Sequence, residues 1–315
     1  MVQKNQTVRI FCLFLLLLVS GASTSAQSKK FEFIAFGDMP YRLPDDYARF
    51  ENLIKEVNRE KPAFSVHVGD FKSGSTVCSD EYFNKIFGYF ESFSRPLIYT
   101  PGDNEWTDCN REAAGKYDPL ERLTLLRKMF FKDSKSLGQK KIPLKSQSSN
   151  PEFARYVENV AWEHGGIQFA TVHLVGTNNN FKGTDNTEFI EREKANLAWL
   201  DEIYARASDK AGLVMFTQAD MFYSRTISPA FQKIIDKLSQ LSRQYGKPVL
   251  WVNGDSHRFI VDKPLLNPDK RSTILNFTRV QVFGDADIAT VHVTVNPRAK
   301  ELFTIRQMLL DKGEK

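Results

Sequence analysis

The chain has 315 residues, of which 42% are hydrophobic and 26% are charged, and its 43 basic and 38 acidic residues give a net charge of +5. This composition is ordinary for a soluble globular protein, and it contains no low-complexity segment. The small positive charge, with no basic run interleaved with aromatic residues, argues against a nucleic-acid partner.

The first 26 residues have the pattern of a signal peptide. Lys4 and Arg9 give a basic start, Ile10–Val19 is an apolar core, and small residues end at Ala26, after which we expect cleavage. The apolar core is shorter than the roughly 20 residues that span a bilayer. We therefore predict an exported protein, periplasmic or secreted, with no membrane span after cleavage. An uncleaved anchor is the alternative.

Four short apolar runs end in the same way, with a glycine that permits a sharp turn and an aspartate directly after it. They are Phe31–Phe36 before Gly37-Asp38, Phe64–Val68 before Gly69-Asp70, Pro96–Tyr99 before Gly102-Asp103-Asn104-Glu105, and Val249–Val252 before Gly254-Asp255. Such runs indicate strands buried on both faces. Ligands bind at the carboxyl ends of strands in open α/β sheets. Since four carboxylates at one sheet edge would repel one another, the pattern predicts a metal centre.

The remaining segments alternate between helical and strand patterns. The predicted helices cover residues 47–59, 81–93, 120–131, 186–207 and 231–245, and the further strands cover 155–162, 166–175, 212–217, 272–283 and 288–296. The alternation predicts a largely parallel sheet. The strands within 155–175 and those within 272–296 are expected to form antiparallel pairs, which suggests a second sheet. Residues 132–149 are expected to form a surface loop. No linker interrupts 27–315, which predicts a single domain.

Two cysteines follow the predicted cleavage site, Cys78 and Cys109. In an exported chain an even pair is expected to form a disulfide. This bond would join the loop after Asp70 to the loop after Asp103, and so stiffen two segments that carry predicted ligands.

The order of these motifs resembles the calcineurin-like metallophosphoesterase superfamily. The motifs are Gly37-Asp38, Gly69-Asp70, Gly102-Asp103-Asn104-Glu105 and Gly254-Asp255-Ser256-His257. The strings Val66–Asp70, Pro101–Cys109 and Thr217–Phe222 are similar to an uncharacterised exported branch of it. The resemblance implies an α/β fold, the two-sheet αββα sandwich, over 27–315. It also implies a two-metal site and hydrolysis of phosphate esters through metal-activated water.

The metal ligands implied by the resemblance are Asp38, Asp70, Asp103, Gln218, Asp255 and His257. One ion would contact Asp38, Asp70 and His257, and the other Asp70, Asp103, Asp255 and Gln218. The chain departs from the family pattern because Pro40, Asn104, Gln218 and Asp255 stand where the family motifs have histidines, and only His257 is kept. An oxygen-rich ligand set favours Mg²⁺, Mn²⁺ or Ca²⁺ over Zn²⁺ and Fe, and leaves open whether one or two ions bind.

The catalytic and substrate-binding candidates are chosen by their chemistry and by their positions near the motifs and strand ends. Asn104 replaces the family histidine beside the leaving group and can donate a hydrogen bond but not a proton. His173 is the candidate replacement acid, with a core histidine as the alternative. The substrate-binding candidates are Lys72, Asn104, Asn178 and Asn179, for which a solvated lysine and an Asn-rich turn are the structural alternatives.

Tyr41 is a further candidate metal ligand, as a phenolate. His67, His164 and His292 are expected in structural positions. Gly284-Asp285 is expected to be a simple turn.

The sequence therefore predicts an exported, metal-dependent enzyme that hydrolyses small phosphate mono- or diesters. The alternative is a catalytically degenerate domain of the same fold that binds a metal or phosphate ligand without turnover. In a third hypothesis no metal binds, and the aspartates only cap helices.

Overall fold

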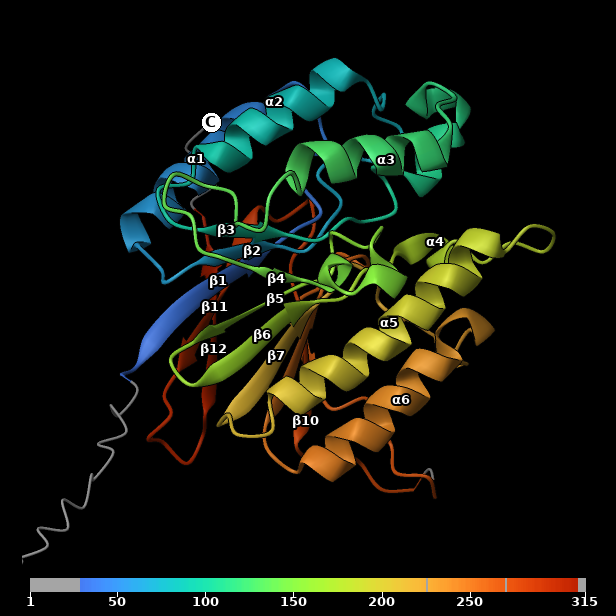
Figure 1. Cartoon of the computed structure of the whole chain (residues 1–315). Helices are drawn as coiled ribbons and strands as arrows, with labels where there is room; N and C mark the ends of the chain where they lie inside the picture. The colour runs from blue at the N-terminus through green and yellow to red at the C-terminus, as the bar shows by residue number, and fades with distance from the viewer. Residues whose placement is uncertain (1–28, 225, 270, 311–315) are drawn as a thin grey trace, which may run out of the picture.

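The protein is a sandwich of two β-sheets with helices on both outer faces (Figure 1). The computed structural model describes residues 29–224, 226–269 and 271–310. The predicted signal peptide, residues 1–26, lies outside the described residues. The four layers of helix, sheet, sheet and helix confirm the predicted αββα sandwich.

The first sheet has five strands among the described residues, in the order β12-β11-β1-β2-β3. They are β1 (Phe31–Phe36), β2 (Ser65–His67), β3 (Leu97–Tyr99), β11 (Ala289–Val295) and β12 (Phe303–Leu309). Strands β1, β2 and β3 are parallel, and β11 runs antiparallel to both β1 and β12. The turns after β1, β2 and β3 therefore lie at one edge of this sheet.

The second sheet has seven described strands, in the order β4-β5-β6-β7-β8-β10-β9. They are β4 (Lys145–Ser146), β5 (Val160–His164), β6 (Ile167–Thr171), β7 (Gly212–Phe216), β8 (Val249–Asn253), β9 (Ile260–Asp262) and β10 (Phe277–Gln281). Strands β6, β7, β8 and β10 are parallel, while β4, β5 and β9 join the edges antiparallel. Both sheets are thus mixed rather than largely parallel.

The helices divide between the two outer faces. In Figure 1, α1, α2 and α3 cover the first sheet and α5 and α6 cover the second. Their bounds are α1 Asp45–Glu60, α2 Asp80–Glu91, α3 Pro119–Phe130, α5 Thr187–Arg206 and α6 Pro229–Tyr245, with the short α4 at Gly176–Asn179. The described helices include none with the length and apolar character to cross a membrane.

The alternation of side chains along each strand explains the layers. In β1, Phe33 and Ala35 point into the core between the sheets, whereas Ile34 and Phe36 pack under the helices. From the second sheet, Val214 and other buried apolar side chains fill the same central layer. Fully burying a side chain of the size of Phe33 contributes about 1.5–3 kcal/mol, so three such layers account for most of the driving force for folding.

One predicted strand pair is wrong. The segments 272–283 and 288–296 contain strands, but β10 belongs to the second sheet and β11 to the first, so they do not pair. The chain crosses from one sheet to the other between them, and β11 pairs instead with β1, more than 250 residues away (Phe31 opposite Val295). Two further strands, β9 and β12, were not predicted. The predicted loop 132–149 contains β4 and a short 3-10 helix, Gln147–Ser149.

The structure joins Cys78 and Cys109 in the predicted disulfide, with Cα atoms 5.8 Å apart. Both cysteines are fully buried, and their Sγ atoms lie 3.7 and 3.6 Å from the backbone oxygen of Asn104. We expect the protein without its signal peptide, denatured but not reduced, to release no free thiol in a titration. Reduction should lower the free energy of unfolding by about 3 kcal/mol. Two reactive thiols per chain before reduction would contradict the pairing.

Candidate functional site

Four aspartates that are distant in sequence meet at the edge where β1, β2, β3 and β8 end; Asp38, Asp70 and Asp103 are buried and Asp255 is half-buried. Asp38 accepts hydrogen bonds from the backbone N–H of Asp255 at 3.1 and 3.2 Å. The Nε2 atom of Gln218 lies 3.2 Å from an oxygen of Asp70 and 3.2 Å from an oxygen of Asp103. The structure therefore places these carboxylates together, as the strand-Gly-Asp pattern predicts.

The backbone at this edge is strained. Asp38, Asp70, Asp255 and His257 have φ values of 53°, 56°, 80° and 58°, in the left-handed region. For residues other than glycine this conformation costs about 1–2 kcal/mol each, and such strain clusters at functional sites. The surrounding contacts hold the four residues in a conformation that their own side chains disfavour.

Glycines make room for the carboxylates. A Cβ atom on Gly102 would lie 2.0 Å from Oδ1 of Asp70, and one on Gly254 would lie 2.4 Å from Oδ2 of Asp38. A Cβ atom on Gly176 would meet oxygens of both Asp255 and Asp103, at 2.8 and 2.9 Å. The glycines of the motifs are thus required by the close approach of acidic side chains as well as by turn geometry.

The carboxylates carry little compensating positive charge. Burial, followed by repulsion from Asp255, raises the pKa of Asp38 well above its usual range, and burial followed by repulsion from Asp103 does the same for the pKa of Asp70. Burial also raises the pKa of Asp255 to about 7. Among the described residues, the basic group that pairs with any of the four is His257, whose Nε2 lies 3.6 Å from Asp38.

The Asp70–Asp103 half of the cluster, which we call the closed half, is filled by hydrogen-bond donors. Oδ2 of Asp70 accepts from Tyr41 Oη at 3.0 Å, Asn104 Nδ2 at 2.8 Å and Gln218 Nε2 at 3.2 Å. Oε1 of Gln218 already accepts the N–H of Gly176 at 2.6 Å, so its nitrogen faces the carboxylates. In this geometry Gln218 is a donor to the carboxylates, and its role as a metal ligand stays a prediction.

The other half, formed by Asp38, Asp255 and His257, is the open half. Asp255 and His257 lie in the wall of a cavity of about 520 Å³. The cavity is lined by Gly176, Thr177, Asn178, Asp220, Met221, Tyr223, Ser224, Thr226, Ser228, Phe231, Asp255, Ser256 and His257. A ligand in this cavity would therefore contact the open half directly.

The fold is shared with solved phosphatases, although the sequence gives no match. No family model and no curated protein sequence matches the chain. A dimetal phosphatase from Danio rerio is similar in structure with a TM-score of 0.55 and 10% identity, over 89% of this chain and 98% of that one. The chain has the calcineurin-like metallophosphoesterase fold. At this identity the likeness establishes the fold alone.

Two further solved structures extend the comparison. The purple acid phosphatase PPD1 from yellow lupin (Lupinus luteus) has a TM-score of 0.52 and 15% identity, over 91% of this chain and 55% of that one. GAP50, described as the anchor in the inner membrane complex of Plasmodium, has a TM-score of 0.51 and 11% identity, over 90% of this chain and 90% of that one. Proteins described as enzymes and as an anchor thus share this fold.

The candidate metal ligands are not gathered into a metal site in this structure. Within the described residues, no group of three or more His, Cys, Asp or Glu side chains is arranged so that it could hold a metal ion. The open half nevertheless offers carboxylate oxygens from Asp38 and Asp255 and an imidazole from His257, a ligand set that suits Mn²⁺ or Mg²⁺. In the closed half, amide and hydroxyl donors occupy the oxygens that a second ion would need.

Two residues of the closed half differ from their predicted roles. Burial and the neighbouring Asp70 raise the pKa of Tyr41 well above its usual range, so its phenol stays protonated and donates to Asp70. This protonated phenol is no phenolate ligand. Asn104 donates through Nδ2 to Asp70 and to the Tyr41 hydroxyl, at 2.8 and 3.0 Å. Asn104 therefore orients the carboxylate in this structure, and its amide is not free to meet a leaving group.

Lys72 and Asn179 have structural roles rather than the predicted substrate contacts. The ammonium of Lys72 is fully buried and donates to the backbone oxygens of Ser73 and Asn104 at 2.8 and 2.7 Å. Asn179 accepts from Arg192 at 2.6 Å and is 1% exposed. Of the two predicted asparagines, Asn178 is the one in the cavity wall.

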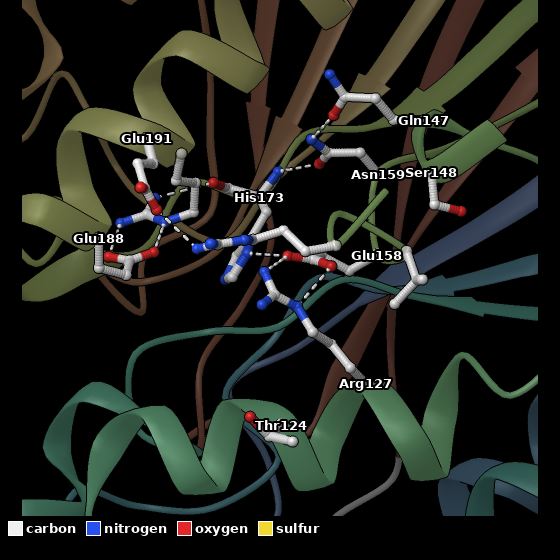
Figure 2. Close-up of polar contacts among 12 residues, drawn as sticks. Thr124, Arg127, Gln147, Ser148, Glu158, Asn159, His173, Glu188 and Glu191 are labelled. Atoms are coloured by element: carbon white, nitrogen blue, oxygen red, sulfur yellow. Dashed lines mark hydrogen bonds and ion pairs between the residues drawn. The ribbon is translucent and has the colours of Figure 1, made fainter. Parts of the chain in front are cut away.

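His173 lies in a separate buried network and is not the predicted acid. Figure 2 shows its ring against Glu158, with Nδ1 2.8 Å from Oε1, and Glu158 in turn paired with Arg127. Burial lowers the pKa of His173, so the ring is a poor proton donor at neutral pH. Its ring bonds to Glu158 and packs against Trp106, away from the four aspartates.

Two residues that sequence reasoning left without a role support the site. Glu105 is fully buried, and its Oε1 accepts from the N–H of Asp70, the N–H of Gly102 and the hydroxyl of Tyr99. It thereby locks the turn after β3 to the loop after β2. The sequence signal that could have revealed the role of Glu105 is its place in the Gly-Asp-Asn-Glu motif.

Asp285, predicted to be part of a simple turn, contacts the open half. Its Oδ1 lies 3.2 Å from Nδ1 of His257, and a Cβ atom on Gly284 would lie 2.3 Å from the Cβ of His257. A carboxylate on the second ring nitrogen orients the imidazole so that Nε2 faces Asp38. The sequence signal that could have revealed this role is the Gly284-Asp285 pair, which repeats the Gly-Asp pattern of the four motifs.

The helix-capping hypothesis does not describe these aspartates. Asp38 accepts from the N–H of Asp255, and Asp70 accepts from the N–H of Asn104, both across the cluster. Helix α2, which follows Asp70, is capped by Ser79 instead.

Proposed function

We propose that this protein hydrolyses small phosphate esters with one divalent cation held by Asp38, Asp255 and His257. The observation that carries the proposal is a cluster of mutually repelling carboxylates, three buried and one half-buried, of which Asp255 borders a cavity. A cation would offset this charge, and the fold neighbours include phosphatases. A divalent cation in such a site polarises a phosphoryl oxygen and lowers the pKa of water.

The chain's own residues would prepare the site for this chemistry. Asp285 holds His257 toward Asp38. The closed half keeps Asp70 and Asp103 fixed behind the open half through Tyr41 and Gln218. Because these donors are already bonded to carboxylates, the closed half supports the site without taking part in proton transfer.

The direct test is release of p-nitrophenol from mono- and bis-p-nitrophenyl phosphate with Mg²⁺, Mn²⁺, Ca²⁺ or Zn²⁺. We expect hydrolysis that requires a divalent cation, is greatest with Mg²⁺ or Mn²⁺, and stops with chelator. The double variant Asp70→Asn, Asp103→Ala should be inactive because it removes two of the clustered charges. Activity that survives this double change would show that the chemistry lies elsewhere.

The closed half gives a further prediction. Gln218→Glu replaces the bridging donor by a carboxylate, so Asp70, Asp103 and the new side chain would together form a second oxygen-rich site. We expect the stoichiometry of Mn²⁺ binding, measured by calorimetry, to rise from one to two ions per chain. Gln232→Glu, on the exposed face of α6, is the control and should leave it at one.

A second candidate function is ligand binding without turnover. The closed half favours it, because Gln218 and Asn104 occupy the carboxylate oxygens with hydrogen bonds. The two candidates differ in one result. Stoichiometric cation binding together with no hydrolysis of a broad phosphate-ester panel would support binding alone.

We also propose that the protein is exported. The support is the signal-peptide pattern of residues 1–26 and the Cys78–Cys109 disulfide, a bond typical of oxidising compartments. Cleavage after Ala26, read from the N-terminal sequence of the protein recovered from expressing cells, tests this. An intact N-terminus on the recovered protein would contradict it.

A further inference from the structure

The cavity beside the open half has a wall that is built at a conformational cost. Thr177, Asn178, Asn179 and Asn180 have φ values of 44°, 56°, 53° and 56°, so four consecutive residues other than glycine are left-handed. Single left-handed residues are common in turns, but a run of four is not. Three of the four are asparagines, which adopt this conformation more readily than other side chains, and the surrounding contacts extend it over four residues. We call this segment, which covers most of α4, the left-handed turn.

A buried ion pair on α5 holds the left-handed turn in place. Arg192 is fully buried and donates to the side-chain and backbone oxygens of Asn179, at 2.6 and 2.9 Å. Glu188 pairs with Arg192 at 2.6 Å and accepts from Asn180 at 2.8 Å. A turn held by a buried guanidinium is pre-organised, which lowers the entropy lost when a ligand binds against it.

The left-handed turn presents polar groups to the cavity. The hydroxyl of Thr177 donates to Asp103, and Asn178 accepts from Ser228, the residue that caps the start of α6. The turn thus links the carboxylate cluster to the opposite wall of the cavity. Strain located at this link marks the wall as part of a functional site.

The other walls combine hydroxyl groups with one exposed ring. Hydroxyl side chains of Thr177, Ser224, Thr226, Ser228 and Ser256 line the cavity. Tyr223 lies in the same wall, and 77% of it is exposed, an unusual exposure for a large aromatic residue. The hydroxyl hydrogens of Thr177, Ser228 and Ser256 are donated to Asp103, Asn178 and Asp220, so these hydroxyl oxygens remain as acceptors. A free aromatic face together with hydroxyl oxygens that accept suits a compact ligand with one apolar face and several hydroxyl donors.

We propose that this cavity binds the alcohol part of the substrate and that this alcohol is a hydroxyl-bearing ring of the sugar type. The proposal rests on the proposed function, because the phosphoryl group would then lie at Asp255 and His257, which share the cavity wall. Tyr223 would contact one face of the ring, and Asn178 and its neighbouring hydroxyls would bind its edge. The volume of about 520 Å³ suits a ligand of this size.

The test compares three probes by calorimetry, with Mn²⁺ and with chelator: glucose 6-phosphate, hexyl phosphate and inorganic phosphate. We expect glucose 6-phosphate to bind at least about 10-fold more tightly than hexyl phosphate, although both have six carbons. Tyr223→Ala should remove most of this preference. So should Asn178→Gly, which keeps a residue suited to the left-handed turn but removes the amide.

The matched control is Leu275→Ala, which removes a similarly exposed apolar side chain outside the cavity. It should leave the preference unchanged. Equal or tighter binding of hexyl phosphate, no measurable binding of either ester, or a preference that survives Tyr223→Ala would overturn the proposal.

The outcomes separate this inference from the proposed function. If p-nitrophenyl phosphate is hydrolysed without any preference for glucose 6-phosphate in binding, only the ligand class is wrong. If glucose 6-phosphate binds with the expected preference but no ester is hydrolysed, the ligand class stands and hydrolysis is wrong.

Discussion

Asp38→Asn is expected to lower kcat/KM for p-nitrophenyl phosphate by at least about 100-fold. Asp38 is fully buried, and His257 is the basic side chain beside it. The substitution keeps the size of the side chain but removes the charge that would bind the cation. Loss of a partner that only orients a metal ligand already costs about 10- to 100-fold, so loss of a charged ligand should cost more.

Two controls accompany this variant. Asp201→Asn, an exposed carboxylate on α5 that pairs with Lys237, should retain full activity. The melting temperature of Asp38→Asn in chelator should not fall below that of the parent, because the change relieves repulsion from Asp255. An active Asp38→Asn variant, or inactivity that accompanies unfolding, would count against a role for Asp38 in the reaction.

Asp255→Asn is expected to stabilise the cation-free protein at pH 8 and to have little effect at pH 4. Burial, then repulsion from Asp103, raises the pKa of Asp255 from 3.8 to about 7 in the folded protein. Between these two values the folded state holds the proton more tightly than the unfolded state, so stability falls as the pH rises from about 4 to about 7. Because asparagine does not ionise, the variant does not lose this stability as the pH rises.

The gain at pH 8 should be about 1–3 kcal/mol in the free energy of urea unfolding, measured in chelator. Adding Mn²⁺ should stabilise the parent and not the variant, which reverses their order. In the variant, the hydrogen bond from the backbone N–H of Asp220 to residue 255 is kept, because the side-chain oxygen of asparagine accepts it as the carboxylate does. If the parent were the more stable protein in chelator at pH 8, the carboxylates would not be in electrostatic conflict.

Much of the layer structure follows from local patterns. The apolar runs of β1 and β8 and the stripes of α1 and α6 are each encoded within about 16 residues, so periodicity reveals them. The pairing of β11 with β1 depends on residues at opposite ends of the chain. Nothing within a short window specifies that partner, which is why the antiparallel pair of 272–296 was wrong.

The same distinction applies to the site. The strand-Gly-Asp endings place Asp38, Asp70, Asp103 and Asp255 because the topology of parallel strands determines the edge. The side to which Gln218 turns its nitrogen depends on the N–H of Gly176, a contact made only in three dimensions. His173 could not be placed from sequence either, because its partner Glu158 lies on a neighbouring segment whose register was not predicted.

Direct measurement of cation binding tests the central claim. The parent chain, freed of metal and titrated with Mn²⁺ in a calorimeter at pH 7.5, should bind one ion per chain, and Asp38→Asn should abolish that binding. No binding by the parent, or equal binding by parent and variant, would contradict the account.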